Sequence, residues 1–471
     1  MIKTYNNLYQ HNTFNINKFI AKLYIFCLTF RMISPLVDIA NLFHGMAVYF
    51  DFILHVVGLF LLFLSYRGNF FFGDYHSSKL LRYFAFMVIC FTVSSILMAC
   101  IIQTIYGNYA GESAFSGILG QILYYFQYLL IIVYNINIFH LLSKEEIDRI
   151  LSKLCWFLLF LGYYQILCYT FGGIFKTIGQ TIDIFHILFP EEYMTKLSLT
   201  ASEGAKAGGI VAIIVFPYLL SKITIYHQKI SYYLQILLWL PVIAFMRSTS
   251  AYFMLIAVFF SFGAYLLKKT KNTLTIIFFF FTVIIALVTL FIVINPNAAS
   301  DFSSIIADKN ISYLVFNKIN DISNGSTVLR KVPFIINWHV FVHFPVFGIG
   351  NGLQGYFYTE FFPYEMIVTS GVWEMYVLST QTIVNGILFF PSVLSGYGIV
   401  GFLILCVYIK KMFSLLMIKK NKLGIFYPMF MFSIAAILVH GFQTDFSGKY
   451  YIWFILSIPY MFVNYDKNTR G

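Results

Sequence analysis

Long apolar runs recur along almost the entire chain, and they restrict the folds that it can adopt. Runs of about 17 to 25 apolar residues are long enough to cross the hydrocarbon core of a bilayer as helices. The runs are continuously apolar rather than alternating, which disfavours the strands of a membrane barrel. With 60% hydrophobic and 11% charged residues, the composition excludes a water-soluble globular protein. The sequence therefore predicts an all-α polytopic membrane protein.

About twelve membrane-spanning helices fit the chain, at roughly 20 residues for each span. The predicted spans are 19–37, 47–65, 81–106, 117–140, 154–175, 203–221, 231–246, 249–267, 273–294, 386–409, 424–440 and 449–465. One long interruption separates the ninth span from the tenth. We therefore predict a transmembrane bundle of about nine helices over 1–294, a large and partly helical loop over 295–385, and about three further helices over 386–471.

The distribution of basic residues orients the predicted bundle. Most of the 31 lysines and arginines fall in loops that are cytoplasmic if the N-terminus faces the cytoplasm, as the positive-inside rule requires. Both termini are then cytoplasmic, and the large loop 295–385 faces the outside. We interpret the net charge of +12 mainly as a signal of membrane topology, because most basic residues fall in the predicted cytoplasmic loops. No basic patch is interleaved with stacking aromatic residues, so nucleic acid is not an expected partner.

Two arginines are notable because they fall on the outer side, against the general bias. Arg247 lies in the short outer turn before the span 249–267, and Arg330 lies in the large loop beside Lys331. An arginine at the end of a span can simply extend its side chain to the lipid headgroups. Alternatively, its planar and permanently charged guanidinium suits a phosphate or diphosphate. The adjacent lysine favours this second interpretation for Arg330.

An acidic motif, ASEGAKAGG, opens the predicted span 203–221. Glu203 has two interpretations. A carboxylate in the first turn of a helix often only caps that helix. Near the membrane surface, it can instead act as a general base toward a hydroxyl. Lys206, three residues later, can pair with Glu203 or face a ligand.

Metal and cofactor sites have little support in the sequence. His339 and His343 are four residues apart and would share one face of a helix. They can form a metal pair, but no third ligand is evident, and hydrogen-bonding or substrate-contacting imidazoles are the favoured interpretation. The six cysteines all fall in apolar runs without paired spacing, so we predict neither a disulfide framework nor a zinc site. No metal and no cofactor are expected.

The second half of the large loop combines glycines, acids and aromatic residues. The run FPVFGIGNG at 344–352 predicts a tight turn with close backbone packing. Beyond it, Glu374 lies among aromatic residues that include Tyr376. Such a segment suits stacking on sugar rings while acids bind hydroxyls. It equally suits a position at the level of the lipid headgroups, where tyrosine and tryptophan are enriched.

Taken in order, these motifs resemble those of the bacterial O-antigen polymerases and the related O-antigen ligases. One motif is ASEGAKAGG at the start of a middle span, and another is the arginine and serine turn MRSTSAYFMLIAVFF. Arg330, Trp338 and the two histidines then precede FPVFGIGNG, and GYGIVGF follows at 396–402. The resemblance covers most of the chain.

The resemblance implies a GT-C-like glycosyltransferase in the bacterial inner membrane, with its active site on the periplasmic side. The implied activity is that of an O-antigen polymerase, a metal-independent enzyme that joins undecaprenyl-pyrophosphate-linked oligosaccharide units into long polysaccharide. A chain-length regulator and a flippase are the partners implied by the family.

Two other functions remain open. One is an O-antigen ligase, which transfers the glycan to the lipid A core. Ligases of this family look to need a histidine after the glycine run, and this chain has none between His343 and His440. The other is a flippase or transporter for lipid-linked oligosaccharide. Transporters concentrate paired polar groups in the middle of the membrane and generally have short loops, unlike the pattern here.

The expected mechanism follows from charge. Negative charge builds up on the departing diphosphate, so electrostatic clamping matters more than acid catalysis. A carboxylate would accept the proton of the acceptor hydroxyl. The residues predicted to act in catalysis are Arg247, Arg330, Glu203 and Glu374. Those predicted to bind substrate are Lys331, Lys206, His339, His343, Trp338 and Tyr376.

Overall fold

The computed structural model of the 471-residue chain is built from helices. It describes residues 16–30, 50–66, 70–171, 175, 177, 197, 199–200, 204–226, 229–246, 248–269, 325–367, 370–381, 388–446 and 449–461. Within these residues there is no β-strand, only an isolated bridge between Tyr109 and Glu112. The predicted all-α fold is confirmed for this part of the chain.

The helices follow one another along the chain. Residues 16–26 are helical, and the named elements are α3 (Phe50–Ser65), α4 (Tyr75–Tyr106), α5 (Ala114–Leu141), α6 (Lys144–Phe171), α8 (Gly204–Ile210), the π-helical turn η1 (Val211–Val215), α9 (Phe216–Ile225), α10 (Ile230–Met246), α11 (Thr249–Lys269), α15 (Gly325–His343), the 3-10 turns η2 (Gln354–Phe357) and η3 (Tyr364–Met366), α16 (Ser370–Gln381), α17 (Phe389–Leu423), α18 (Phe426–Gly441), α19 (Tyr450–Leu456) and the 3-10 turn η4 (Ile458–Tyr460).

Six of the described helical stretches are long and apolar enough to cross a membrane. They are formed by α4, α5, α6, the continuous run from α8 to α9, α11 and α17. Shorter apolar helices lie in α3, α10 and α18. The membrane character predicted from the sequence is thereby supported, whereas the count of about twelve spans stays a prediction. The predicted span 273–294 lies outside the described residues.

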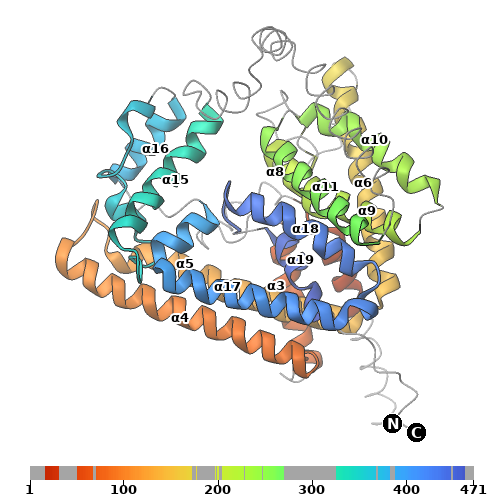
Figure 1. The fold of residues 1–471 in the computed structure, drawn as a ribbon, viewed down its shortest axis with the longest axis horizontal. Helices are drawn as coiled ribbons and strands as arrows, with labels where there is room; N and C mark the ends of the chain where they lie inside the picture. The colour runs from red at the N-terminus through yellow and green to blue at the C-terminus, as the bar shows by residue number, and fades with distance from the viewer. Residues whose placement is uncertain are drawn as a thin grey trace.

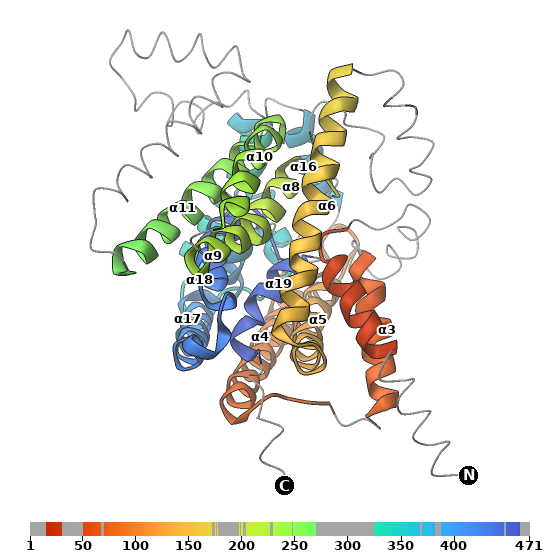
Figure 2. The same ribbon diagram turned by 90° about the vertical axis from the view of Figure 1, so that its right-hand side faces the viewer.

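The helices form two groups above a shared base (Figure 1). α15 and α16 lie together on one side, and α6 lies with α8, α9, α10 and α11 on the other. α17, α18 and α19 lie between and beneath the two groups. Seen from the side, α6 runs along the second group from the end of α5 to α10 (Figure 2). The end of α18 therefore lies where the two groups face each other.

α4 shows how these helices are built to contact lipid on one side. Its N-cap, Asp74, accepts a hydrogen bond from the backbone N–H of Ser77 at 2.8 Å, which satisfies a donor of the first turn. Phe84 and Phe91 are buried against the bundle, whereas Phe86 is 55% exposed. An exposed apolar face of this kind is stable in lipid because hydrocarbon chains are as apolar as the protein interior.

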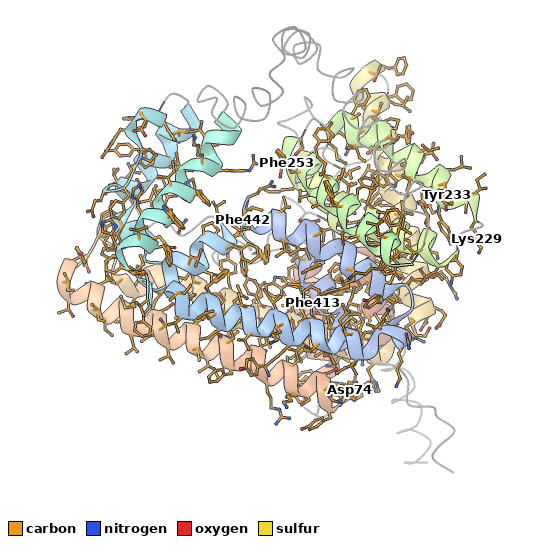
Figure 3. All side chains as sticks on the ribbon, in the orientation of Figure 1. Asp74, Lys229, Tyr233, Phe253, Phe413 and Phe442 are labelled. Carbon is orange, nitrogen blue, oxygen red and sulfur yellow. The ribbon has the colours of Figure 1, made fainter. Side chains whose placement is uncertain are left out.

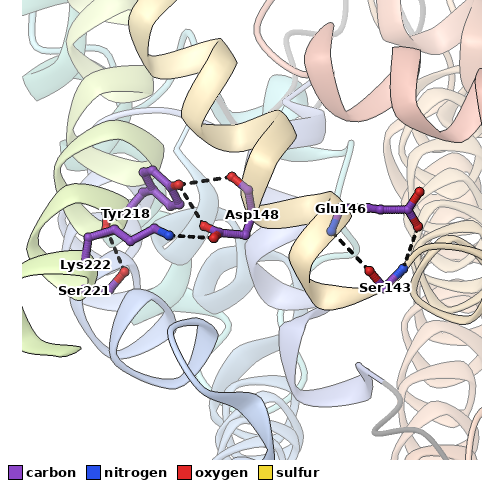
Figure 4. Close-up of polar contacts among 6 residues, drawn as sticks. All are labelled: Ser143, Glu146, Asp148, Tyr218, Ser221 and Lys222. Carbon is purple, nitrogen blue, oxygen red and sulfur yellow. Dashed lines mark hydrogen bonds and ion pairs between the residues drawn. The ribbon is translucent and has the colours of Figure 1, made fainter. Parts of the chain in front are cut away.

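Ion pairs gather at one end of the helices. Asp148 in the first turns of α6 pairs with Lys222 of α9 at 2.5 Å (Figure 4). Lys419 of α17 pairs with Asp74 at 2.9 Å. Glu146 forms a reciprocal capping pair with Ser143 and ion pairs with two lysines of the first described helix, Lys18 at 3.1 Å and Lys22 at 2.9 Å.

These lysines all belong to the segments that the positive-inside rule assigned to the cytoplasm. A further ion pair, that of Lys449 with Asp445, lies beyond the opposite end of α18. The grouping agrees with the predicted orientation, in which this ion-paired end is cytoplasmic. Which face of the membrane it occupies stays a prediction.

The glycine run 344–352 joins the large loop to the bundle. The backbone N–H groups of Ile349 and Gly350 donate to carbonyls of α17 at 3.0 and 2.7 Å. Those carbonyls are available because α17 is kinked at Gly398, where φ is 60°. A Cβ on Gly348 would lie 2.3 Å from the α17 backbone. The run therefore forms the close-packed turn that the sequence predicts, and the loop satisfies the backbone groups that the kink releases.

Candidate functional site

Two of the predicted catalytic residues, Arg247 and Glu203, lie outside the described residues. The helices that follow them are described, since α11 begins at Thr249 and α8 at Gly204. The remaining candidates lie on α8, α15 and α16. Their positions decide which of them can act together.

Arg330 and the two histidines lie on different sides of α15. Nine residues at about 100° each place His339 roughly half a turn around the helix from Arg330. His339 and His343 both pack on the ring of Phe361, with centroid distances of 5.5 and 4.8 Å. Nδ1 of His343 lies 2.8 Å from the carbonyl oxygen of His339. The histidines share one face, as predicted, but this face packs on the loop.

Trp338 and Lys331 lie on another side of α15. Their spacing from Arg330 places them about 80° and 100° around the helix. Trp338 is 51% exposed and packs on Phe341 with a centroid distance of 5.6 Å. This aromatic and basic surface is of the kind found at the depth of lipid headgroups.

α16 carries Glu374 and Tyr376, and it packs against α15. Glu374 is exposed. Tyr376 packs edge-on against Phe362 and Tyr364, with centroid distances of 5.1 and 5.5 Å. The described ring contacts of Tyr376 are thus with neighbouring aromatic residues of the same loop.

Arg330 influences the connection between α18 and α19 electrostatically. The positive charges of Arg330 and Lys449 both disfavour a further positive charge on the imidazole of His440. His440, in the last turn of α18, is 3% exposed, and Lys449, just before α19, is 5% exposed. Figure 3 labels Phe442 at this end of α18, in the region between α15 and the first turns of α11, where Phe253 is labelled. His440 and Lys449 are therefore buried at the same end of α18, and the positive charge of Arg330 bears on them from α15.

The turn after α18 is held by its own hydrogen bonds. The backbone N–H groups of Gln443 and Thr444 donate to the carbonyl of His440 at 2.9 and 3.0 Å. Lys449 forms an ion pair with Asp445 at 3.0 Å and donates to the hydroxyl of Thr444 at 2.9 Å. These contacts fix the ammonium group relative to the imidazole.

α8 and α11 close around the same turn. The hydroxyl of Ser250, in the first turn of α11, donates to the side-chain oxygen of Gln443. On α8, a Cβ added to Gly209 would lie 3.2 Å from the hydroxyl oxygen of Tyr451 and 3.4 Å from Cε1 of His440. Gly209 thus allows close approach of α8 to the turn. We call the following residues the α18–α19 cluster: Arg330, His440, Asp445, Lys449 and Tyr451.

One predicted residue, Lys206, lies on α8, the helix that approaches this cluster at Gly209. Lys206 precedes Gly209 by three residues, so the two lie on the same side of α8. Ser250, in the first turn of α11, contacts Gln443 of the turn after α18. Arg247 and Glu203 lie outside the described residues, and the other predicted residues lie elsewhere on α15 and α16.

Sequence reasoning missed His440, Asp445 and Lys449 as site residues. The signal was present in HGFQTDFSGKY at 440–450. There, a histidine stands at the end of an apolar span, and an acid precedes a lysine by four residues in a short connection. Ionisable residues inside or beside membrane spans are costly and commonly functional.

The cluster combines two chemical capacities. Arginine and lysine side chains bind phosphate oxygens, with the guanidinium offering a bidentate fork. A neutral histidine offers one ring nitrogen with a lone pair that can accept a proton. Among the described residues, no group of three or more histidine, cysteine, aspartate or glutamate side chains is arranged to hold a metal ion.

Comparison with known proteins does not identify the chain. No family model, curated protein or solved structure matches it. The functional argument therefore rests on the cluster and on the sequence motifs that lead to it.

Proposed function

We propose that the chain is a membrane-embedded glycosyltransferase of the O-antigen polymerase type. It joins oligosaccharide units carried on undecaprenyl pyrophosphate at the periplasmic face of the bacterial inner membrane. The observation that carries the proposal is the group of ionisable side chains at the end of α18. There the buried imidazole of His440 lies beside the turn that holds Lys449 in its ion pair with Asp445, and Arg330 of α15, selected from the sequence as a diphosphate ligand, adds positive charge.

The reaction explains why basic groups would be gathered in this way. When the bond between the anomeric carbon and the phosphate oxygen breaks, negative charge develops on the leaving diphosphate. Preorganised cations in a site with little water stabilise that charge far better than water does. In this proposal Arg330 grips the diphosphate with two N–H groups, and Lys449 adds a second positive charge.

The residues at the two ends of the helices also support an enzyme whose active site opens on one side of the membrane. The lysines shown in ion pairs at one end, which are Lys18, Lys22, Lys222 and Lys419, all belong to segments assigned to the cytoplasm from the sequence. The α18–α19 cluster lies at the other end of α18. A site at that end is reached from the outer leaflet, where a lipid-linked donor would hold its sugars.

The test is reconstitution of the purified protein in vesicles with undecaprenyl-pyrophosphate-linked repeat units, followed by gel analysis of the glycan. We expect a ladder from the wild type. Arg330→Ala should lower the rate at least about 100-fold, because a preorganised charge contact of this kind is typically worth that much. Arg330→Lys should recover little, since the bidentate fork is lost.

Arg149→Ala is the matched control, because Arg149 is an exposed arginine in the first turns of α6, at the ion-paired end. It should retain the wild-type ladder. A wild-type ladder from Arg330→Ala would remove this residue from the mechanism.

The same vesicles distinguish the two alternative functions. Addition of lipid A core should not be needed for glycan growth by a polymerase, whereas a ligase would form product only when that acceptor is present. A flippase would move a labelled lipid-linked unit across the bilayer without forming a glycosidic bond.

A further inference from the structure

His440 is a buried histidine whose burial needs an explanation. It is 3% exposed, and neither ring nitrogen has a hydrogen-bond partner among the described residues. Buried polar groups are normally hydrogen-bonded, because a group that gives up water without a replacement loses free energy. A ring nitrogen kept in this condition is available to a ligand.

Burial of the His440 ring favours its neutral form, because a buried charge loses its hydration. The positive charges of Lys449 and Arg330 act in the same direction, since they repel a second positive charge. The carboxylate of Asp445 is held 3.0 Å from the Lys449 ammonium. The ion pair with Lys449 therefore determines where the Asp445 carboxylate lies. A neutral imidazole has one nitrogen with a free lone pair, which is what accepting a proton requires.

The ring of His440 is also held in position. Phe446 lies nearly parallel to it, with an interplanar angle of 11° and a centroid distance of 6.4 Å. Gly209 of α8 lies on another side, close enough that a Cβ there would touch Cε1 at 3.4 Å. A group oriented by its packing is better suited to proton transfer than one that rotates freely.

We propose that His440 accepts the proton of the acceptor sugar hydroxyl during glycosyl transfer. This inference rests on the proposed function. The hydroxyl oxygen forms a bond to the anomeric carbon of the donor, and the bond from that carbon to the diphosphate oxygen breaks. The electron pair of the broken bond stays on the diphosphate, beside Arg330 and Lys449. The hydroxyl proton passes to a ring nitrogen of His440 and then to water.

This role replaces a carboxylate with a histidine as the proton acceptor. Glu374, one of the carboxylates considered from the sequence, is exposed on α16. His440 instead lies beside the turn that holds the ammonium of Lys449, since Thr444 contacts both residues. A proton acceptor must lie within hydrogen-bond reach of the hydroxyl while the donor diphosphate is bound, so a base beside the cations is the better placed of the two.

The experiment compares His440→Gln with the wild type in the reconstituted transfer assay. Transfer and binding of the lipid-linked donor are measured separately, and His76→Gln serves as control because His76 is an exposed histidine at the ion-paired end. Loss of a general base typically lowers the rate by about 100-fold to 10,000-fold. We expect a loss in that range for His440→Gln, with donor binding within about threefold of the wild type.

The pH profile is a second readout that a structural role would not affect. Wild-type transfer should fall at acidic pH, as a proton occupies the imidazole, and His440→Gln should lose that acidic limb. The charged and titratable groups that bear on the ring are Arg330 on α15, Lys449 and Asp445 in the turn, and Tyr451 on α19. α8, which approaches the ring at Gly209, also carries Lys206.

The outcomes separate this inference from the proposed function. If the wild type makes no glycosidic bond, the proposed function fails. If the wild type transfers and His440→Gln transfers within about threefold of it, the proton-accepting role is wrong while the function stands. If His440→Gln loses both donor binding and transfer, the role is also overturned, because His440 would then be a binding or folding residue.

Discussion

Replacing Asp148 by asparagine should destabilise the ion-paired end of the fold. Lys222 is largely buried there, with its side chain 6% exposed, and its ammonium lies 2.5 Å from the carboxylate. Removing one partner of a buried ion pair costs about 3–5 kcal/mol, because the other charge is left without compensation. Two features reduce this value. The side chain of Asp148 is 26% exposed, and Tyr218, Tyr226 and Tyr232 surround the ammonium.

These three rings lie 5.5, 5.2 and 5.9 Å from the lysine nitrogen and keep their attraction in the variant, at about 0.5–2 kcal/mol for each favourable contact. Tyr218 also donates to the backbone carbonyl of Asp148 at 3.0 Å, a contact that asparagine preserves. We therefore expect a loss of about 2–3 kcal/mol in the free energy of unfolding, below the full value for a buried pair.

The assay is denaturant titration of the detergent-solubilised protein, followed by far-ultraviolet circular dichroism. Glu145→Gln is the matched control, since it changes a neighbouring exposed carboxylate to an amide in the same turn. It should change the free energy of unfolding by less than about 0.5 kcal/mol. A double variant that also carries Lys222→Met should recover most of the loss, because no charge then remains buried. Equal stabilities for Asp148→Asn and Glu145→Gln would refute this account of the ion pair.

Two further predictions concern close packing and pH. Gly209→Ala puts a methyl group 3.4 Å from Cε1 of His440. It should slow glycosyl transfer several-fold while leaving the helix content unchanged. The control is Gly120→Ala on α5, where a Cβ meets nothing within 4 Å, and this variant should transfer at the wild-type rate. The pKa of Asp74 lies below its ordinary value of 3.8, because partial burial, which raises the pKa, is outweighed by a backbone N–H and by Lys419. Its stabilising contribution is therefore complete above about pH 4 and is lost as the pH falls through the lowered pKa, so stability titrations of Asp74→Asn should show a weaker decline in acid than the wild type.

Much of the fold was predictable because the bilayer allows few alternatives. Continuous apolar runs predict helices, and most described residues in those runs are helical, with exceptions such as the turn at 27–30 within the predicted span 19–37. The glycine run 344–352 was interpreted correctly as a close-packed turn, since several glycines beside a proline suit little else. Its partner was not predictable. The turn packs against the kinked part of α17, and the kink itself arises at Gly398 from a φ of 60° that the surrounding apolar sequence does not indicate.

The site was predictable only in part, because a sequence shows which residues are unusual but not which faces they occupy. Arg330, Trp338 and His339 were grouped since they lie within ten residues of one another. On α15 they point in three directions, and Arg330 instead acts on His440, more than a hundred residues further along the chain. Arg330 was identified because a basic residue on the outer side runs against the positive-inside bias. A different argument, that ionisable groups at the end of an apolar span are expensive to bury, selects His440. The position of His440 relative to α15 depends on the packing of the helices, which the sequence does not show.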